Sequence, residues 1–213
     1  MTKIKICGIT GVAYARAAIE AGADLIGVVF APSPRQVTHE KAREIVAAVK
    51  EHNLPAVGVF VNMPAAKVNA VASDCGLDWV QLSGDESWDY CRQIEKPVIK
   101  AIHISNKLGE EELLAHLKEG KRVLGSRPSI YLLDTFVEQK YGGTGKIFAW
   151  ETARRAVAKY PVIIAGGLHP ENVGEVVSSL KPWGVDVSSG VESRGVKDVA
   201  KIKDFVKSVR SAD

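Results

Sequence analysis

The stretch LIGVVFAPSPRQVTHEKAREIVAAVK, residues 25–50, contains a strand pattern followed by a helix pattern. Its apolar, β-branched beginning predicts a buried strand over residues 25–30. The later segment EKAREIVAAVK repeats its apolar residues at helical spacing, and Thr38 stands where a helix N-cap is favoured. A strand, a loop and a helix in succession form the repeating unit of α/β proteins.

The same alternation continues in both directions along the chain. Seven further strands are predicted at residues 4–7, 56–61, 79–82, 98–102, 130–134, 162–165 and 185–188. Eight units fill the chain, so we expect a single domain over residues 1–213 and a parallel sheet closed into a (β/α)8 TIM barrel. The alternative is an open doubly wound sheet, but no G-x-G-x-x-G motif follows the first strand.

The composition is that of an ordinary soluble domain, with 46% hydrophobic and 25% charged residues. A net charge of +3 is too small to indicate a nucleic-acid partner or a membrane surface. Lys3 and Lys5 interrupt the first apolar run, so no signal peptide is expected. No membrane helix is expected either, because no stretch approaches the ~20 consecutive apolar residues that one needs. The cysteines Cys7, Cys75 and Cys91 have no C-x-x-C spacing, which favours a reducing cytoplasm over a disulfide framework.

In a barrel of this kind, catalytic groups lie at the C-terminal ends of the strands and in the loops that follow. Cys7 ends the first predicted strand, and Gly8 after it carries no side chain that would crowd a ligand. Cys7 could be a small buried hydrophobe. Its position favours chemistry instead, because strand alternation places Lys5 on the same face, and a cation favours the reactive thiolate.

Asp134 and Arg35 are the next two candidates at this end of the barrel. Asp134 follows the apolar strand 130–134, where partial burial would raise its pKa and make it a general acid, although it could simply cap a turn. Arg35 lies in the loop after the second strand. It could be a surface charge or could clamp a carboxylate with two hydrogen bonds.

The last two strands are followed by glycine-containing segments, AGGL at 165–168 and SSG at 188–190. Glycines let backbone N–H groups approach an anion, and barrels commonly hold phosphate at this pair of loops. The alternative is a pair of tight turns. The predicted phosphate-binding residues are Gly166, Gly167, Ser189 and Gly190.

Two other kinds of site are not expected. The segment YGGTGK, residues 141–146, lacks the spacing of a Walker loop and is better interpreted as a lid with glycine hinges. The five histidines show no metal-ligand spacing, so no metal site is predicted.

Several of these motifs together resemble the phosphoribosylanthranilate isomerase family of tryptophan biosynthesis. They are KICGIT, the SPR after FAP, VGVFVN, LLDT, YGGTGK, AGGLHPENV and GVDVSSGVE, and they extend over essentially the whole chain. The resemblance implies a (β/α)8 barrel that performs an Amadori rearrangement of a phosphorylated small molecule, without cofactor or metal.

The resemblance also implies a division of roles. Asp134 would protonate the ribose ring oxygen, and Cys7 would remove the proton from C2. Arg35 would hold the anthranilate carboxylate. Gly166, Gly167, Ser189 and Gly190 would bind the phosphate through backbone groups.

The chain departs from the family pattern at two positions: Ser83 replaces a histidine after VQL, and Ala149 replaces an aspartate in FDW. Neither position carries the proton transfers. Two rival interpretations remain, a histidine-pathway ProFAR isomerase, in which aspartate usually stands at Cys7, and a barrel that binds a sugar phosphate without turnover. Monomer and homodimer are both compatible with the sequence.

Overall fold

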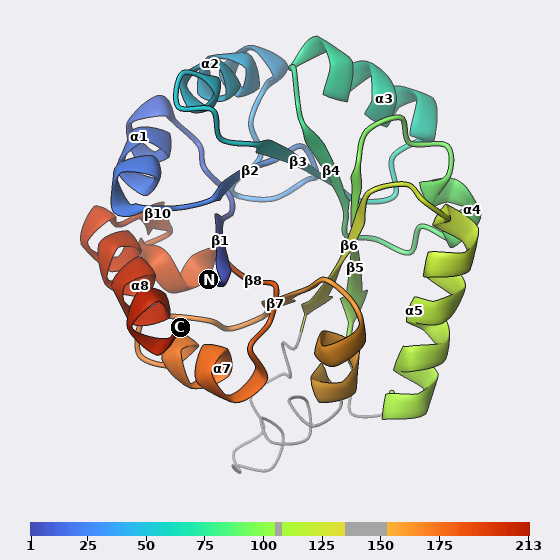
Figure 1. Ribbon diagram of the computed structural model, residues 1–213. Coiled ribbons are helices and arrows are strands. Elements are labelled where there is room, and N and C mark those ends of the chain that lie inside the picture. The colour runs from blue at the N-terminus through green and yellow to red at the C-terminus, as the bar shows by residue number, and fades with distance from the viewer. Residues whose placement is uncertain (105–107, 135–152) are drawn as a thin grey trace.

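The computed structural model describes residues 1–104, 108–134 and 153–213. Within these residues eight parallel strands, β1 to β8, form a closed barrel in which each strand pairs with its neighbour in the chain and β8 pairs with β1. Helices surround the strands on the outside (Figure 1). This confirms the predicted (β/α)8 barrel and excludes the open sheet, because each edge strand of an open sheet has only one neighbour, whereas every strand here has two.

The strands are β1 Lys3–Ile6, β2 Leu25–Val29, β3 Ala56–Phe60, β4 Trp79–Leu82, β5 Val98–His103, β6 Ser129–Asp134, β7 Val162–Ala165 and β8 Gly184–Val187. The helices are α1 Val12–Ala21, α2 His39–Lys50, α3 Ala65–Asp74, α4 Trp88–Cys91, α5 Glu110–Leu124, α7 Val173–Leu180 and α8 Val199–Ala212. Residues 153–159 are also helical. The predicted bounds of β4 and β7 are identical to these, and those of the other strands differ by one residue at one or both ends.

The helix signals in the sequence correspond to local hydrogen bonds and dihedral angles. Thr38 caps α2, and its hydroxyl oxygen accepts a hydrogen bond from the N–H of Lys41 at 3.2 Å. Gly22 ends α1 with a φ of 101°, a left-handed conformation that glycine adopts without a Cβ penalty.

The barrel interior is apolar in its middle and polar at one end. A cluster of inward-facing side chains fills the middle: Leu25, Val57, Ile99, Ala101, Ile130, Leu132, Ile163 and Ala165. Toward the C-terminal ends of the strands, the buried residues include Lys5, Gln81 and Asp186. Charged groups are rarely buried unless they are paired, so this end of the barrel is the place to look for a site.

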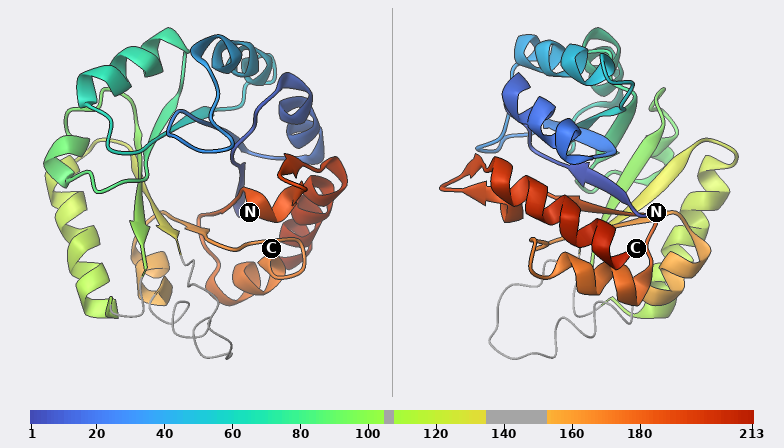
Figure 2. Two further views of the ribbon diagram at one scale, coloured as in Figure 1. Left: turned by 180° about the vertical axis from the view of Figure 1, so that it is seen from behind. Right: turned by 60° about the vertical axis from the view of Figure 1, so that its left-hand side comes forward.

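The chain after β8 has features that the strand and helix periodicity did not predict. A short 3-10 helix, η1 Ser189–Val191, leads into a two-stranded ribbon of β9 Glu192–Ser193 and β10 Val196–Lys197. Helix α8 then returns along the barrel and brings the two chain ends together (Figure 2).

Some sequence features fall outside the described residues, namely the YGGTGK segment and Ala149. Among the described residues, no helix is long and apolar enough to cross a membrane.

Candidate active site

Cys7 lies directly after β1 and not at its last position, but its N–H still donates to the Val187 carbonyl at 2.8 Å. The side chains of Cys7 and Lys5 are both buried beside Gly27 of β2. A Cβ at residue 27 would lie 2.9 Å from the Cys7 sulfur and 3.1 Å from the Lys5 Nζ. The thiol and the ammonium group therefore share one tight space at the mouth of the barrel, as strand alternation predicted.

Lys5 also forms a buried ion pair with Asp186 of β8, with 2.9 Å between Nζ and Oδ1. Burial alone would lower the pKa of Lys5, but Asp186 and Cys7 raise it above its ordinary value. For Cys7, burial has a larger effect on the pKa than the neighbouring charges do. Burial raises the pKa of the thiol, and the opposing effect of Lys5 is smaller. The expected cationic neighbour is present and favours the thiolate as expected, but burial, which the sequence did not show, outweighs it.

A second group of charges lies beside this thiol. Arg35 donates two hydrogen bonds to Glu192 of β9, from Nε at 2.6 Å and from Nη2 at 2.8 Å. Lys197 of β10, whose side chain is almost fully buried, pairs with the same carboxylate at 2.7 Å. Although burial opposes it, these two cations lower the pKa of Glu192 to about 2.

Arg35 lies over Gly8, where a Cβ would come within 2.6 Å of the arginine Cδ. Gly8 has a φ of 73°, so both its conformation and its surroundings require glycine. Arg35 is thus at the barrel mouth as predicted, but Glu192 takes two of its five N–H donors. A carboxylate ligand would have to approach from the Nη1 side of the guanidinium group.

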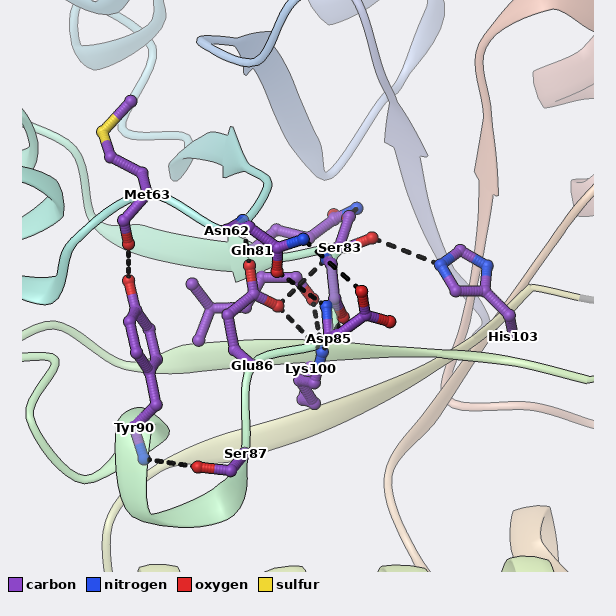
Figure 3. A network of polar contacts seen from close by, with 12 residues as sticks. Asn62, Met63, Gln81, Ser83, Asp85, Glu86, Ser87, Tyr90, Lys100 and His103 are labelled. Carbon is purple, nitrogen blue, oxygen red and sulfur yellow. Dashed lines mark hydrogen bonds and ion pairs between the residues drawn. The ribbon is translucent and has the colours of Figure 1, made fainter.

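Asp134 is the last residue of β6, and it lies opposite His103 of β5 in the strand register. The distance from His103 Nδ1 to Asp134 Oδ2 is 3.5 Å. The other ring nitrogen, Nε2, lies 3.2 Å from the Ser83 carbonyl oxygen (Figure 3). The hydrogen bond with Asp134 is the largest of the effects that raise the pKa of His103.

The loop after β4 is tied to β5 by a buried ion pair of Glu86 and Lys100, with 3.0 Å between Oε2 and Nζ (Figure 3). The Glu86 carboxylate accepts hydrogen bonds from the N–H groups of Asn62 and Gly84 at 2.8 and 2.9 Å. Lys100 also donates to the Gly84 carbonyl oxygen at 2.6 Å. These contacts hold the loop that contains Ser83.

The glycine loops after β7 and β8 lie against each other. Gly166 and Gly167 have φ values of 93° and 65°, which L side chains rarely adopt. A Cβ at Gly190 in η1 would come within 1.8 Å of the Leu168 carbonyl oxygen. The structure thus brings together the predicted phosphate-binding segments, which also contain Ser189. Among the described residues, no group of three His, Cys, Asp or Glu side chains could hold a metal ion.

Sequence reasoning did not single out Asp186, Glu192, Lys197 or His103 as site residues. Asp186 has a signal, because a charged residue stands in the apolar strand GVDV. The others depend on which strands and loops become neighbours, and a single sequence does not contain that information.

The comparisons with known proteins agree with this arrangement. The family model described as "PRAI: N-(5'phosphoribosyl)anthranilate (PRA) isomerase" matches residues 4–208. N-(5'-phosphoribosyl)anthranilate isomerase of Dehalococcoides mccartyi is 48% identical over 215 residues, covering 100% of this chain and 98% of the relative. The enzyme of the same name from Geotalea uraniireducens is 46% identical, covering 97% and 98%.

Solved structures give the same result. The crystal structure of phosphoribosyl anthranilate isomerase from Thermotoga maritima has a TM-score of 0.82 and 38% identity, covering 99% of this chain and 100% of that one. A second structure is a phosphoribosyl anthranilate isomerase in complex with reduced 1-(o-carboxyphenylamino)-1-deoxyribulose 5-phosphate. Its TM-score is 0.78 at 37% identity, with 99% and 100% of the two chains covered.

Proposed function

Because the chain belongs to the N-(5'-phosphoribosyl)anthranilate isomerase family, we propose that two side chains at the barrel mouth carry its proton transfers, Asp134 as general acid and Cys7 as general base. The chain is an isomerase that acts on N-(5'-phosphoribosyl)anthranilate in tryptophan biosynthesis. The observation that carries the proposal is the position of both groups at the C-terminal end of the barrel, Cys7 directly after β1 and Asp134 at the end of β6, where this fold places its chemistry.

In the first step of the proposed Amadori rearrangement, Asp134 gives a proton to the ribose ring oxygen. The bond from C1 to that oxygen breaks, and the electron pair of the anthranilate nitrogen forms a Schiff base. The carboxyl group of Asp134 is partly exposed at the barrel mouth, with 30% of its side chain accessible, so a substrate can reach it.

In the second step, Cys7 removes the proton from C2, and the resulting enolamine becomes the ketone of 1-(2-carboxyphenylamino)-1-deoxyribulose 5-phosphate. The base must be the thiolate. Burial and the Asp186 carboxylate disfavour that form, whereas Lys5 and Lys197 favour it, so the role proposed for Cys7 relies on these two buried cations.

Two further contacts position the substrate in this proposal. Arg35 binds the anthranilate carboxylate from its Nη1 side, while Glu192 holds the other edge of the guanidinium group. The phosphate binds to backbone groups of Gly166, Gly167, Ser189 and Gly190. Support comes from the left-handed glycines and from the close contact between the two loops. We infer that no cofactor and no metal takes part.

We also infer one catalytic domain over residues 1–213, active in the cytoplasm as a monomer or homodimer, with no nucleic-acid partner. One solved structure shows monomers generated from the dimeric phosphoribosylanthranilate isomerase of Thermotoga maritima.

The rival ProFAR substrate has two phosphates and would need a second anion site across the barrel mouth. The backbone N–H groups of Asn62 and Gly84, on that side, already donate to the Glu86 carboxylate. These N–H groups are therefore not available to a phosphate, so we expect one phosphate site.

Turnover of the two substrates tests the proposal. Fresh phosphoribosylanthranilate should be consumed, followed by the loss of its anthranilate-type fluorescence, and ProFAR should react far more slowly. A folded protein that binds the substrate without converting it would support the inactive barrel. Comparable rates on both substrates would show a bifunctional enzyme.

A further inference from the structure

We propose that Gln81 is a substrate-binding residue whose side-chain oxygen accepts a hydrogen bond from a hydroxyl group of the pentose. The inference rests on the barrel mouth as the substrate site and does not depend on the roles proposed for Cys7 and Asp134. It adds a contact to the middle of the substrate, between the groups proposed to hold its carboxylate and its phosphate.

The strand register turns the Gln81 side chain into the barrel. Gln81 lies opposite Ile99 of β5, a member of the apolar cluster that fills the barrel interior. Trp79, two residues earlier on β4, packs against the same cluster. Side chains two residues apart on a strand share a face, so Gln81 is the next inward side chain toward the C-terminal end of β4. It therefore lies in the floor of the barrel mouth.

The Gln81 amide has one end paired and the other end unpaired. Its Nε2 donates to the Ser83 hydroxyl oxygen at 3.0 Å (Figure 3). Its Oε1 is buried and accepts no hydrogen bond from any residue in 1–104, 108–134 or 153–213. Buried polar atoms nearly always have a hydrogen-bond partner, and an acceptor without one is costly to the fold. A donor on the substrate explains why an unpaired oxygen is kept in the floor of the substrate site.

The polar side chains of the neighbouring strand β5 have other partners. The Lys100 ammonium group pairs with Glu86 at 3.0 Å. The His103 ring lies against the Ser83 carbonyl oxygen, with 3.2 Å between Nε2 and that oxygen. Neither side chain donates to Oε1 of Gln81, which leaves this acceptor to the ligand.

The chemistry of the substrate makes the pentose hydroxyls the donors. The phosphate and the carboxylate are anionic at neutral pH and act as acceptors. The anthranilate N–H lies beside its own ortho carboxylate, which accepts its hydrogen bond. The pentose hydroxyls remain, and the pentose lies between the carboxylate that we place at Arg35 and the phosphate that we place at Gly167 and Gly190.

The test measures the affinity of two stable ligands for the wild type and for Gln81→Met. One ligand is reduced 1-(o-carboxyphenylamino)-1-deoxyribulose 5-phosphate, the compound in complex with a solved relative. The other is N-(5-phosphopentyl)anthranilate, which keeps the carboxylate, the carbon chain and the phosphate but has no hydroxyl. Methionine matches glutamine in length and has no amide oxygen. We expect Gln81→Met to weaken binding of the hydroxylated ligand by about 3- to 10-fold and to leave binding of the pentyl ligand unchanged.

An amide that only packs or holds the loop gives a different result. Equal weakening of both ligands, or no weakening of the hydroxylated one, contradicts the inference. Wild-type protein that binds neither ligand would instead contradict the barrel mouth as the substrate site, and with it the proposed function. Gln93→Met, the same change at an exposed position in the turn after α4, is the matched control and should bind both ligands as the wild type does.

Ser83→Ala is a second variant, which keeps Gln81 and removes the hydroxyl that orients its amide. Binding of the hydroxylated ligand should weaken by less than in Gln81→Met, and binding of the pentyl ligand should not change. Thermal midpoints close to that of the wild type show that the variants are folded. Wild-type affinity of Ser83→Ala for the hydroxylated ligand would contradict the orientation assigned to the Gln81 amide.

Discussion

The position of the Cys7 sulfur depends on the absence of a side chain at Gly27. A Cβ there would press on the sulfur at 2.9 Å and on the Lys5 Nζ at 3.1 Å, both closer than ordinary contact. We expect Gly27→Ala to displace the thiol and to lower kcat by about 10- to 100-fold, because small misplacements of a reacting group are costly. The same overpacking should cost about 1–3 kcal/mol of unfolding free energy.

The control at the residue scale is Gly174→Ala in α7, where the added Cβ would meet its nearest neighbour at an ordinary 3.6 Å. Its kcat should be unchanged. Wild-type kcat in Gly27→Ala would show that the thiol does not need this position.

At the scale of elements, the ribbon of β9 and β10 is held to the barrel mouth by Glu192, which pairs with Arg35 and Lys197. The pKa of Glu192 is about 2 in the folded protein, below the ordinary 4.5. A lowered pKa contributes stability that is fully present above the unfolded value and is lost as the pH falls through the folded one. Glu192→Gln should therefore reduce the unfolding free energy by up to about 3–5 kcal/mol above pH 4.5, and by progressively less toward pH 2.

Urea denaturation at several pH values measures this difference. Glu44→Gln is a suitable control, because the exposed pair of Glu44 with Lys41 should contribute little. A difference between the wild type and Glu192→Gln that does not change with pH would contradict the assigned ion pairs.

At the scale of the whole molecule, the seam between the first and last parts of the chain closes the barrel. The Asp213 carboxylate accepts hydrogen bonds from the Thr2 N–H at 2.9 Å and from the Thr2 hydroxyl at 2.6 Å, which joins α8 to the start of β1. Hydrogen bonds to charged groups contribute about 1.5–3 kcal/mol. We expect Asp213→Ala to lower the unfolding free energy by that amount and to leave kcat unchanged. Asp204→Ala, on the same helix, is the control. An equal loss of unfolding free energy in both variants would contradict a specific contribution of the hydrogen bonds between Asp213 and Thr2.

The barrel could be predicted from the sequence because its signals are local. Each strand shows as an apolar run, and the start of α2 shows in Thr38, whose cap needs only three neighbouring residues. Cys7, Arg35 and Asp134 could be placed at the barrel mouth for the same reason. Their partners could not, since Glu192 is 157 residues from Arg35 in the chain and reaches it only through the unpredicted ribbon. The net pKa of Cys7 also depends on burial, which no sequence pattern measures.

Steady-state turnover of phosphoribosylanthranilate by Cys7→Ala and Asp134→Asn tests whether Cys7 and Asp134 carry the two proton transfers. Loss of an acid or base typically costs about 10²–10⁴-fold. We predict a decrease of that size in kcat for each variant, with circular dichroism and thermal midpoint close to the wild type. The control is Cys75→Ala, at a buried cysteine that follows α3, and it should keep wild-type kcat. Wild-type kcat in a folded Cys7→Ala or Asp134→Asn variant would contradict the account.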